Sequence, residues 1–424
     1  MTAPVNTNTP RHDSADRHVS GTARYADDLA EARDMTHLAL GLSTIARGEI
    51  IRADLSAVRA APGVVAVLTG DDVPGINDTG PVIHDEPAFA LSGGAGQVSY
   101  HGQALFAVVA ESRNLARAAA RLAVIEYVEE IPILTIDDAI AAGSYLHDPY
   151  QMARGDAASA IAAAPRRLAG SIDMGGQDHF YLEGQIAVAT PGEDGDIHVL
   201  SSTQHPSEVQ AVVAHNLNVP SHAVTVEVRR MGGGFGGKET QGNLIAVACA
   251  LAARVTGRPA KLRLDRDDDM VLTGKRHPFR VSYEVGFDDD GRIRGVAFEQ
   301  WANCGSSHDL SAAIADRAMF HADNAYYYPA CEITSHRCKT NLVSMTAFRG
   351  FGGPQGLIAA ERIIEEIAYA TGKDPVEIRR LNFYGDEGRD VTPYWQTVED
   401  NILPRLTDEL LASSDYFERR RDII

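Results

Sequence analysis

The sequence predicts an α+β protein in which a small α/β domain precedes part of a larger, mixed α+β domain. Its 424 residues exceed one ordinary domain, and length alone predicts roughly two to three. Up to residue 140, short apolar strands alternate with helices, whereas hairpins and two glycine-rich strand-to-helix junctions dominate beyond residue 167. We expect domains over 18–140 and 150–390, with 391–424 forming the start of a further, truncated domain.

The first segment contains short strands bounded by turn residues. Residues 38–42 and 64–68 predict strands, and the apolar run 103–110 predicts a strand buried on both faces. The alanine-rich segment 114–123 predicts a helix that leads into a strand at 124–128.

The second segment combines hairpins with longer helices. Residues 186–190 and 197–201 flank a Gly/Asp-rich turn and predict a hairpin, as do the two halves of 281–301. Pro206 opens a helix whose apolar residues share one face. The other expected elements are a strand at 224–228 and helices over 240–255, 357–370 and from Asp374 to about 383.

Composition excludes several classes of protein. The longest apolar stretch, 244–253, is shorter than the roughly 18 residues of a membrane span. A formal charge of −19 argues against nucleic-acid binding, and the polar N-terminus lacks a secretory signal, so we expect a cytoplasmic protein. The four cysteines form no CxxC pair and predict buried free thiols rather than a zinc or iron–sulfur site.

Met231–Glu239, with the sequence MGGGFGGKE, is the strongest local signal. Its glycines allow close backbone approach to a ligand, and a following helix N-terminus favours an anionic or oxo group. The loop lacks the acidic partner of a dinucleotide fingerprint and the Gly-Lys-Ser/Thr of a phosphate-binding loop. The alternative is a glycine run that only permits tight packing.

A second glycine-rich loop, AFRGFGG, contains Arg349 and Phe351. The guanidinium of Arg349 suits anions or oxo groups, and Phe351 offers a stacking surface. Taken by itself, the loop favours the alternative of a surface arginine and a core phenylalanine.

Four segments in order, STQHP, RMGGGFGGKET, DRAMFHADNAY and TAFRGFGGPQG, resemble the molybdenum-binding large subunits of xanthine dehydrogenases. These belong to the xanthine oxidase and aldehyde oxidase superfamily of molybdenum hydroxylases. VSGTARYADD and YHGQALFAVVAES are similar to that family's entry segment and small α/β hammerhead domain. The resemblance runs from about His18 to the end, and implies a hammerhead-type domain followed by part of a molybdopterin-binding domain.

The resemblance implies a molybdenum–molybdopterin cofactor whose metal takes its sulfur ligands from the pterin. Gln204 would hydrogen-bond an oxygen ligand of molybdenum, and Arg349 would lie close to the metal. Phe235, flanked by Gly234 and Gly236, would direct its backbone N–H to another metal ligand. These residues are therefore expected near molybdenum, through its ligands or through backbone groups.

The resemblance also implies a purine substrate, because Glu239 and Arg317 match the pair that holds the ring in xanthine-oxidising members. A guanidinium would stabilise negative charge on the ring, and a carboxyl group would hydrogen-bond its nitrogens. Phe351 would stack on the substrate. One departure is Ala313, where the family often has a polar residue.

The family's general-base glutamate lies beyond the end of this chain, so the chain looks like the N-terminal part of the subunit, with no certain catalytic residue of its own. The expected partners are the missing C-terminal half and a small subunit carrying FAD and two [2Fe–2S] clusters that reduces NAD. The expected assembly is a dimer of heterodimers. The alternatives are an enzyme acting on aldehydes or other N-heterocycles, and a truncated, inactive fragment.

Three further features have simpler interpretations. His179 is expected to have a structural hydrogen-bonding role rather than to act as a base. The acidic runs 265–269 and 288–290 predict a solvated loop and a hairpin turn, because neither has the spacing of a calcium loop.

Overall fold

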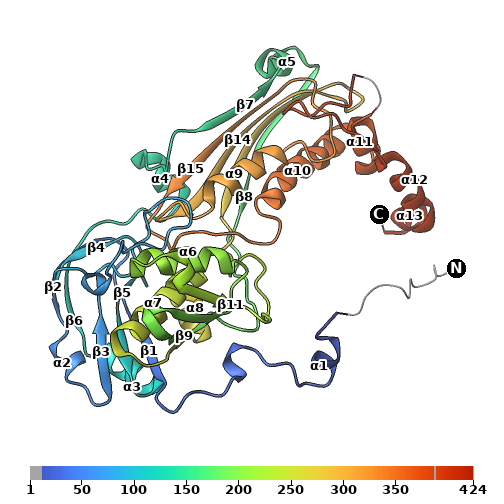
Figure 1. The fold of residues 1–424 in the computed structure, drawn as a ribbon. Coiled ribbons are helices and arrows are strands. Elements are labelled where there is room, and N and C mark those ends of the chain that lie inside the picture. The colour runs from blue at the N-terminus through green and yellow to red at the C-terminus, as the bar shows by residue number, and fades with distance from the viewer. Residues whose placement is uncertain (1–11, 386–387, 424) are drawn as a thin grey trace.

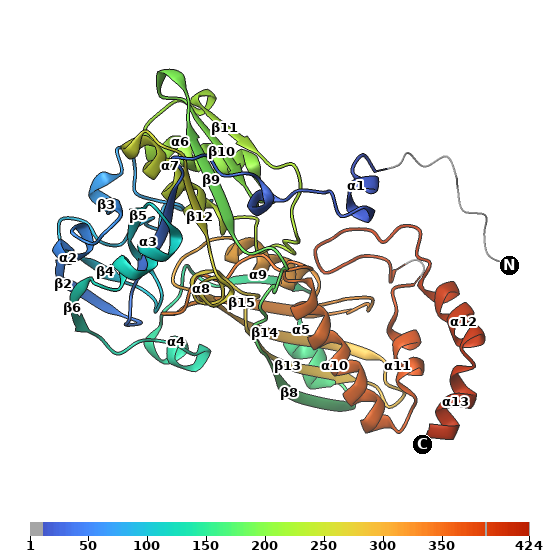
Figure 2. The same cartoon turned by 90° about the horizontal axis from the view of Figure 1, so that it is seen from below.

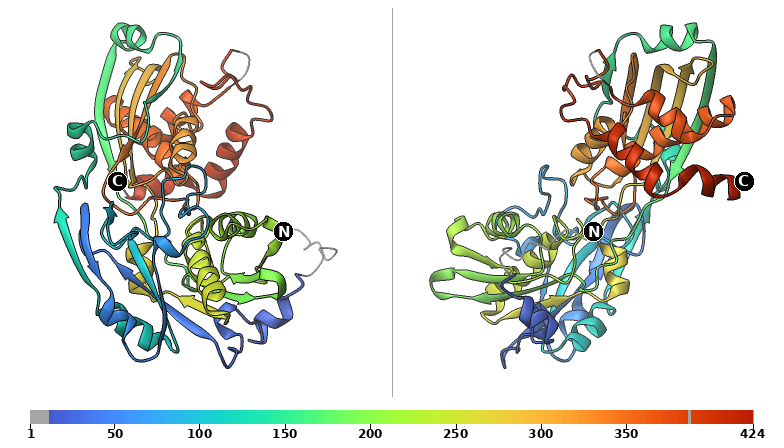
Figure 3. Two further views of the ribbon diagram at one scale, coloured as in Figure 1. Left: turned by 60° about the vertical axis from the view of Figure 1, so that its left-hand side comes forward. Right: turned by 90° about the vertical axis from the view of Figure 1, so that its right-hand side faces the viewer.

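The computed structural model describes residues 12–385 and 388–423. Within them, three sheets of seven, five and three strands are covered by helices (Figure 1). The five-stranded sheet and its helices form one lobe, and the other two sheets form the second lobe (Figure 3). This mixture of sheets and helices confirms the predicted α+β class.

The seven-stranded sheet draws strands from both 18–140 and 150–390. Its order is β11-β10-β9-β12-β1-β5-β3. The strands are β1 (Thr36–Leu42), β3 (Val64–Leu68), β5 (Ala104–Ala110), β9 (Ile186–Pro191), β10 (Ile197–Ser201), β11 (Val224–Glu227) and β12 (Ala260–Arg263). Strands β1 and β12 pair in parallel, with Thr36 opposite Ala260, so one continuous sheet joins the two parts of the chain.

Several predicted elements occur in this sheet and on its face. Every residue of β5 is buried, as its apolar run predicts. Strands β9 and β10 form the predicted antiparallel hairpin. Helices α6 (Pro206–Leu217) and α7 (Gly242–Thr256) pack against each other and against the sheet, and their apolar faces enclose its largest core cluster. The first glycine loop therefore lies between β11 and α7, whose apolar residues anchor it in the core.

A second core lies between β1, β3 and β5 and the three-stranded sheet. That sheet has the order β4-β2-β6, with β2 at Gly48–Asp54, β4 at Gly96–Val98 and β6 at Val124–Glu129. Helices α2 (Ser56–Arg59) and α3 (Arg113–Ala120) pack against β3, and α3 also packs against β1 and β5. In Figure 2 the three-stranded sheet, α2 and α3 group around β3 and β5, at one end of the seven-stranded sheet.

The five-stranded sheet has the order β7-β15-β14-β13-β8. Its strands are β7 (Tyr150–Arg154), β8 (Arg166–Met174), β13 (Phe279–Phe287), β14 (Ile293–Gly305) and β15 (Cys331–Lys339). Helix α10 (Gly353–Thr371) buries Ile363, Ile364 and Ile367 against apolar residues of β13–β15, which confirms the predicted helix and second hairpin. Helices α9 (Ser311–Phe320), α11 (Pro375–Asn382) and α5 (Ala157–Ala163) complete the lobe.

The remaining helices are peripheral. They are α1 (Ala15–Val19), α4 (Ile136–Ala142), α8 (Arg266–Leu272), α12 (Leu403–Ser413), α13 (Tyr416–Ile423) and the short 3₁₀ helices Ala26–Asp28, Gly70–Asp72, Glu193–Gly195 and Ser221–Ala223. Helices α12 and α13 lie beside α11 (Figure 2), tied by ion pairs such as Arg380 with Asp408. No helix in the part of the chain that the structure describes is long and apolar enough to cross a bilayer.

The acidic run 265–269 was predicted as a solvated loop, and that prediction is wrong. Most of it lies in α8, and Asp265 and Asp268 pair with arginines of α3. Asp269 is buried and accepts hydrogen bonds from the Tyr181 hydroxyl (2.6 Å) and the Gln185 backbone N–H (3.0 Å). The sequence pattern could not show this, because the arginines, Tyr181 and Gln185 that contact the run are distant from it in sequence.

All four cysteines are free and buried, as predicted.

Candidate functional site

The two glycine-rich loops are in direct contact. The Arg349 backbone N–H donates to the carbonyl of Phe235 over 2.9 Å. A β-carbon added at Gly236 would lie 2.5 Å from the carbonyl oxygen of Ala347, so a side chain there would separate the loops. Glycine is thus required for this approach, and two segments more than 100 residues apart in sequence form one surface.

Both loops contain the same uncommon backbone conformation. Phe235 and Gly236 have φ of +55° and +99°, and Phe351 and Gly352 have φ of +48° and +93°. A left-handed phenylalanine costs about 1–2 kcal/mol, and such strain persists where the surroundings enforce it. Phe235 is 48% exposed, and Phe351 is more buried but still partly exposed, so both residues remain accessible at the loops.

The loops differ in how they meet their helices. Helix α10 begins at Gly353, immediately after the second loop, so its N-terminal N–H groups lie next to that loop. Helix α7 begins at Gly242, three residues beyond Glu239. The helix N-terminus predicted at the first loop is therefore displaced from the glycines.

Gln204 packs its side chain onto the first loop. Its Oε1 accepts a hydrogen bond from the Gly236 backbone N–H (2.8 Å), and its backbone N–H donates to the Lys238 carbonyl (2.7 Å). A β-carbon at Gly234 would lie 2.5 Å from that Oε1. Because the oxygen of the amide is committed, the exposed Nε2 group is left to donate to a ligand.

Lys238 is an important residue whose role the sequence analysis missed. Its buried ammonium lies 3.2 Å from Glu183 Oε2, donates to Ser202 Oγ (2.7 Å) and lies 4.7 Å from the centre of the Tyr181 ring. Burial lowers its pKa, and the Glu183 carboxylate acts in the opposite direction. Lys238 therefore fixes the base of the loop rather than contacting a phosphate. Its position directly after the glycine run was the only signal.

The second loop is held from behind by His179 and Arg276. The His179 Nε2–H donates to the Ala347 carbonyl (2.6 Å), and its ring stacks on Phe348 with centroids 4.6 Å apart. Burial lowers the pKa of His179, which favours the neutral ring in this donor role. The Arg276 guanidinium lies over the Phe348 ring, with Cζ 4.0 Å from the ring centre, and its Nη2 group donates to the Arg349 carbonyl (2.9 Å). His179 thus has the structural role expected of it.

Glu239 and Arg317, the predicted substrate pair, make no hydrogen bond or ion pair through their side chains with any described residue. Glu239 is half-buried, and burial raises its pKa, while His205 lowers it and Glu208 raises it further. Arg317 is exposed on α9, the helix whose Ile314 carbonyl would lie 2.0 Å from a β-carbon at Gly352. Glu239 directly follows the first loop in the sequence, and the helix that carries Arg317 packs against the second loop. Neither side chain has a hydrogen-bond or ion-pair partner among the described residues.

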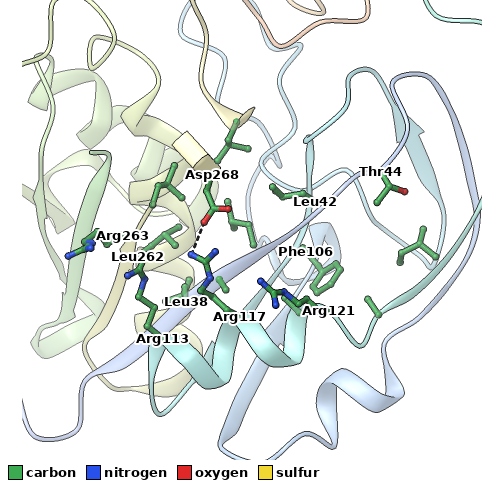
Figure 4. Close-up of a pocket in the computed structure, with 18 of the residues that line it drawn as sticks. Leu38, Leu42, Thr44, Phe106, Arg113, Arg117, Arg121, Leu262, Arg263 and Asp268 are labelled. Carbon is green, nitrogen blue, oxygen red and sulfur yellow. Dashed lines mark hydrogen bonds and ion pairs between the residues drawn. The ribbon is translucent and has the colours of Figure 1, made fainter. Parts of the chain in front are cut away.

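The pocket shown in Figure 4 lies elsewhere. It has a volume of about 440 Å³ and an apolar floor from β1, β5 and β6, and α3 contributes Arg113, Arg117 and Arg121. Arg113 and Arg117 are already paired with Asp265, and Arg117 also lies 2.9 Å from Asp268. None of the predicted site residues lines this pocket.

A small polar cavity of about 70 Å³ lies under the loop that contains Glu86. The Ser307 hydroxyl donates to Glu86, and the buried Asp309 accepts from the Thr240 hydroxyl at 2.7 Å. Burial raises the pKa of Glu86 to about 8, and the nearby charge of Asp309 acts in the same direction. Thr240 directly follows Glu239, so this cluster supports the first loop from the other side.

No group of three or more His, Cys, Asp or Glu side chains within 12–385 and 388–423 is arranged to hold a metal ion.

Two family models match the chain. The model of the aldehyde oxidase and xanthine dehydrogenase a/b hammerhead domain matches residues 20–131, and that of the molybdopterin cofactor-binding domain matches 142–383. The second match covers more than half of the chain and includes both glycine loops.

Known proteins agree with these matches. Xanthine dehydrogenase of Drosophila subobscura is 44% identical over 415 residues, which are 97% of this chain but 30% of that protein. Aldehyde oxidoreductase from Desulfovibrio gigas has the same fold, with a TM-score of 0.87 at 26% identity over 95% of this chain and 46% of its own. Quinoline 2-oxidoreductase from Pseudomonas putida 86 matches with a TM-score of 0.83 at 26% identity, over 97% of this chain and 55% of its own.

The chain thus spans about 30% of the length of the curated relatives it matches. Its two glycine loops, its sheets and both family models agree with one assignment. The chain belongs to the molybdopterin cofactor-binding family, in which that domain follows the a/b hammerhead domain of aldehyde oxidases and xanthine dehydrogenases.

Proposed function

We propose that this chain is part of the molybdenum-binding subunit of a xanthine dehydrogenase-type oxidoreductase. The complete enzyme would oxidise hypoxanthine to xanthine and xanthine to urate, with water as the source of oxygen. The observation that carries the proposal is the uncommitted carboxyl group of Glu239 directly after the interlocked glycine loop. Arg317, on the helix that packs under the second loop, offers the complementary positive charge.

The residues present fit a molybdopterin cofactor. The glycine backbone that β-carbons at Gly234 and Gly236 would obstruct permits close approach, and the Nε2 group of Gln204 is free to donate. Gln204, the backbone N–H of Phe235 and the guanidinium of Arg349 would hold the cofactor near its metal. When bound, this cofactor supplies the redox-active metal that accepts the electrons of the hydroxylation.

The substrate would be held by this chain's own side chains. Because burial raises the pKa of Glu239, its carboxyl group can remain protonated at higher pH than an exposed one and donate to a ring nitrogen. The Arg317 guanidinium would donate to a ring carbonyl oxygen and stabilise negative charge that develops on the purine. Phe351, accessible beside the second loop, would stack on the ring.

Further polypeptide would complete the enzyme. The electrons would pass to [2Fe–2S] clusters and FAD on a small subunit and then to NAD. The family's general-base glutamate would come from a segment equivalent to the C-terminal half of the large subunit. We propose a cytoplasmic dimer of heterodimers. The length of the relatives supports only the presence of further polypeptide, since this chain matches about 30% of the length of each.

The test uses the complete enzyme, assembled with its remaining large-subunit segment and its FAD/iron–sulfur subunit. Turnover of xanthine, of an aromatic aldehyde and of quinoline is measured for the wild type and for Glu239→Val and Arg317→Met. We expect xanthine kcat/KM to fall by roughly 100-fold or more, because Glu239→Val removes a hydrogen-bond donor from a half-buried position and Arg317→Met removes a charge-assisted hydrogen bond. Aldehyde turnover should change far less.

A matched control is Glu193→Val, which removes an exposed carboxylate in the turn after β9. It should leave both activities unchanged. Equal losses for xanthine and aldehyde in the two site variants would contradict the purine assignment and favour an aldehyde or N-heterocycle oxidase. An assembled enzyme without bound molybdenum and without xanthine-dependent dye reduction would instead indicate an inactive product.

A further inference from the structure

A contact between the His205 imidazole and the Glu208 carboxylate lies beside Glu239. His205 Nδ1 is 3.1 Å from Glu208 Oε2, and the Asn243 side-chain amide donates to the other oxygen, Oε1, over 3.0 Å. Glu208 is only 14% exposed, whereas His205 is 49% exposed. Glu208 therefore uses both oxygens to hold its neighbours, and the imidazole remains accessible.

The backbone brings this pair to the first glycine loop. The Gln204 N–H and the Thr203 hydroxyl both donate to the Lys238 carbonyl, at 2.7 and 3.1 Å. Thr203 Oγ1 in turn accepts from the His205 N–H over 3.0 Å. His205 is thus fixed next to Lys238 and the residue that follows it, Glu239, whose electrostatic neighbours include His205 and Glu208.

The predicted substrate pair offers few hydrogen-bond acceptors. A guanidinium such as that of Arg317 only donates, and a protonated Glu239 carboxyl group uses one oxygen as a donor, which leaves its other oxygen to accept. The Glu208 carboxylate favours a proton on His205 Nδ1, which leaves Nε2 as an acceptor in the neutral ring. Nε2 has no hydrogen-bond or ion-pair partner among the described residues.

Oxidised purines carry several ring N–H groups, whereas an aldehyde carries none. A neutral imidazole beside Glu239 therefore discriminates between these substrate classes. Loss of a hydrogen bond in a partly buried site leaves a substrate donor unpaired, which typically weakens binding by about tenfold.

We propose that His205 is a specificity-determining residue of the purine site, in which Nε2 accepts a hydrogen bond from a substrate ring N–H and Glu208 positions the imidazole. This inference rests on the proposed function. His205 would be the third polar residue of the purine site, after Glu239 and Arg317. Glu208 would affect the substrate only by positioning the His205 imidazole.

The experiment uses the complete, cofactor-loaded enzyme with His205→Ala, His205→Asn, Glu208→Ala, Glu208→Gln and the double alanine variant. We expect His205→Ala and Glu208→Ala each to raise KM for xanthine about tenfold, with kcat within twofold and KM for an aromatic aldehyde unchanged. The double variant should match His205→Ala, because Glu208 acts through the imidazole. Glu208→Gln should restore most of the affinity, since its amide oxygen can still face Nδ1.

A second readout is the dissociation constant of the product, urate, measured by titration calorimetry, which should rise about tenfold in His205→Ala. His198→Ala is the matched control, because His198 forms an equivalent exposed pair with Glu227 (3.3 Å) on β10 and β11. The inference is overturned by unchanged xanthine KM and urate binding, by an equal effect on the aldehyde, or by additive losses in the double variant. If His205→Ala does not fold, Glu208→Ala, for which the same tenfold rise in xanthine KM is expected, gives the test.

These outcomes are distinct from failure of the proposed function itself. A wild-type enzyme that oxidises aldehydes but neither xanthine nor hypoxanthine would refute the purine assignment before any variant is compared. A wild-type enzyme that oxidises xanthine, with His205 variants that behave like His198→Ala, would refute only the role of His205.

Discussion

Gly236→Ala should destabilise the protein far more than glycine replacement at an open position. A β-carbon at Gly236 would lie 2.5 Å from the Ala347 carbonyl oxygen and 2.7 Å from its carbonyl carbon. Backbone atoms cannot rotate away as a side chain does, so the second loop must shift. The change also imposes a side chain at φ +99°.

The expected magnitude follows from three contributions. A non-glycine residue at positive φ costs about 1–2 kcal/mol, and forced repacking around an added methyl group costs about 1–3 kcal/mol. Separation of the loops also removes the hydrogen bond from Arg349 to Phe235, worth about 1 kcal/mol. Gly236→Ala should therefore lower the free energy of unfolding by about 3–6 kcal/mol.

The matched control is Gly257→Ala, because Gly257 also has positive φ (+65°) but an added β-carbon there would meet nothing within 4 Å. It should cost only about 1–2 kcal/mol. Urea unfolding followed by circular dichroism compares the two variants, and elemental analysis of the assembled enzyme measures molybdenum per chain. Equal destabilisation in both variants, with molybdenum retained in Gly236→Ala, would refute the interlocked-loop account.

Three other predictions concern buried charges and thiols. Lys238→Met should lower the free energy of unfolding by about 3–5 kcal/mol because it strands the Glu183 carboxylate, and Glu183→Gln in the same chain should recover part of this loss in urea unfolding. Because the folded-state pKa of Glu86 is raised to about 8, its contribution to stability is fully present below its ordinary pKa and is lost as pH rises through 8. Glu86→Gln should therefore flatten the decline in thermal stability between pH 5 and 8, and an unchanged slope would contradict this. The four buried thiols should not react with a disulfide reagent in the native protein and should all react in urea, so rapid native labelling would exclude their burial.

Elements with strong local patterns were predictable from the sequence. The helix expected over 357–370 occurs at Gly353–Thr371, and the helix capped by Asp374 occurs at Pro375–Asn382, where the Asp374 carboxylate accepts from Val376 N–H. Apolar periodicity and cap residues act within a few positions of one another, so they are visible without knowledge of the tertiary structure.

Features that depend on distant partners were not predictable in this way. The pairing of β1 with β12 joins residues more than 200 positions apart, and nothing in either strand specifies the other. Asp269 was expected in a solvated loop because its run is acidic, yet Tyr181 and Gln185 satisfy it in the core.

In the candidate site, too, the local motifs were predictable from the sequence, whereas contacts with distant residues were not. Motif resemblance predicted roles for Gln204 and Glu239, but no motif indicates that the Gln204 amide oxygen accepts from the Gly236 backbone N–H. Lys238 follows the glycine run in the sequence, but its burial against Glu183 depends on a loop over 50 positions away. The roles of Glu239 and Arg317 stay predictions until substrate measurements are made.

The shared seven-stranded sheet has a consequence for how this protein can be divided. Cutting the chain between residues 131 and 142, where one family model ends and the other begins, would expose backbone hydrogen-bonding groups of β1 and β12 along their paired edges. Either piece alone would present an unprotected edge prone to aggregation. Exchange of the hammerhead portion between relatives should accordingly succeed only when the two residue pairs of this junction, Thr36 with Ala260 and His37 with Lys261, keep their register.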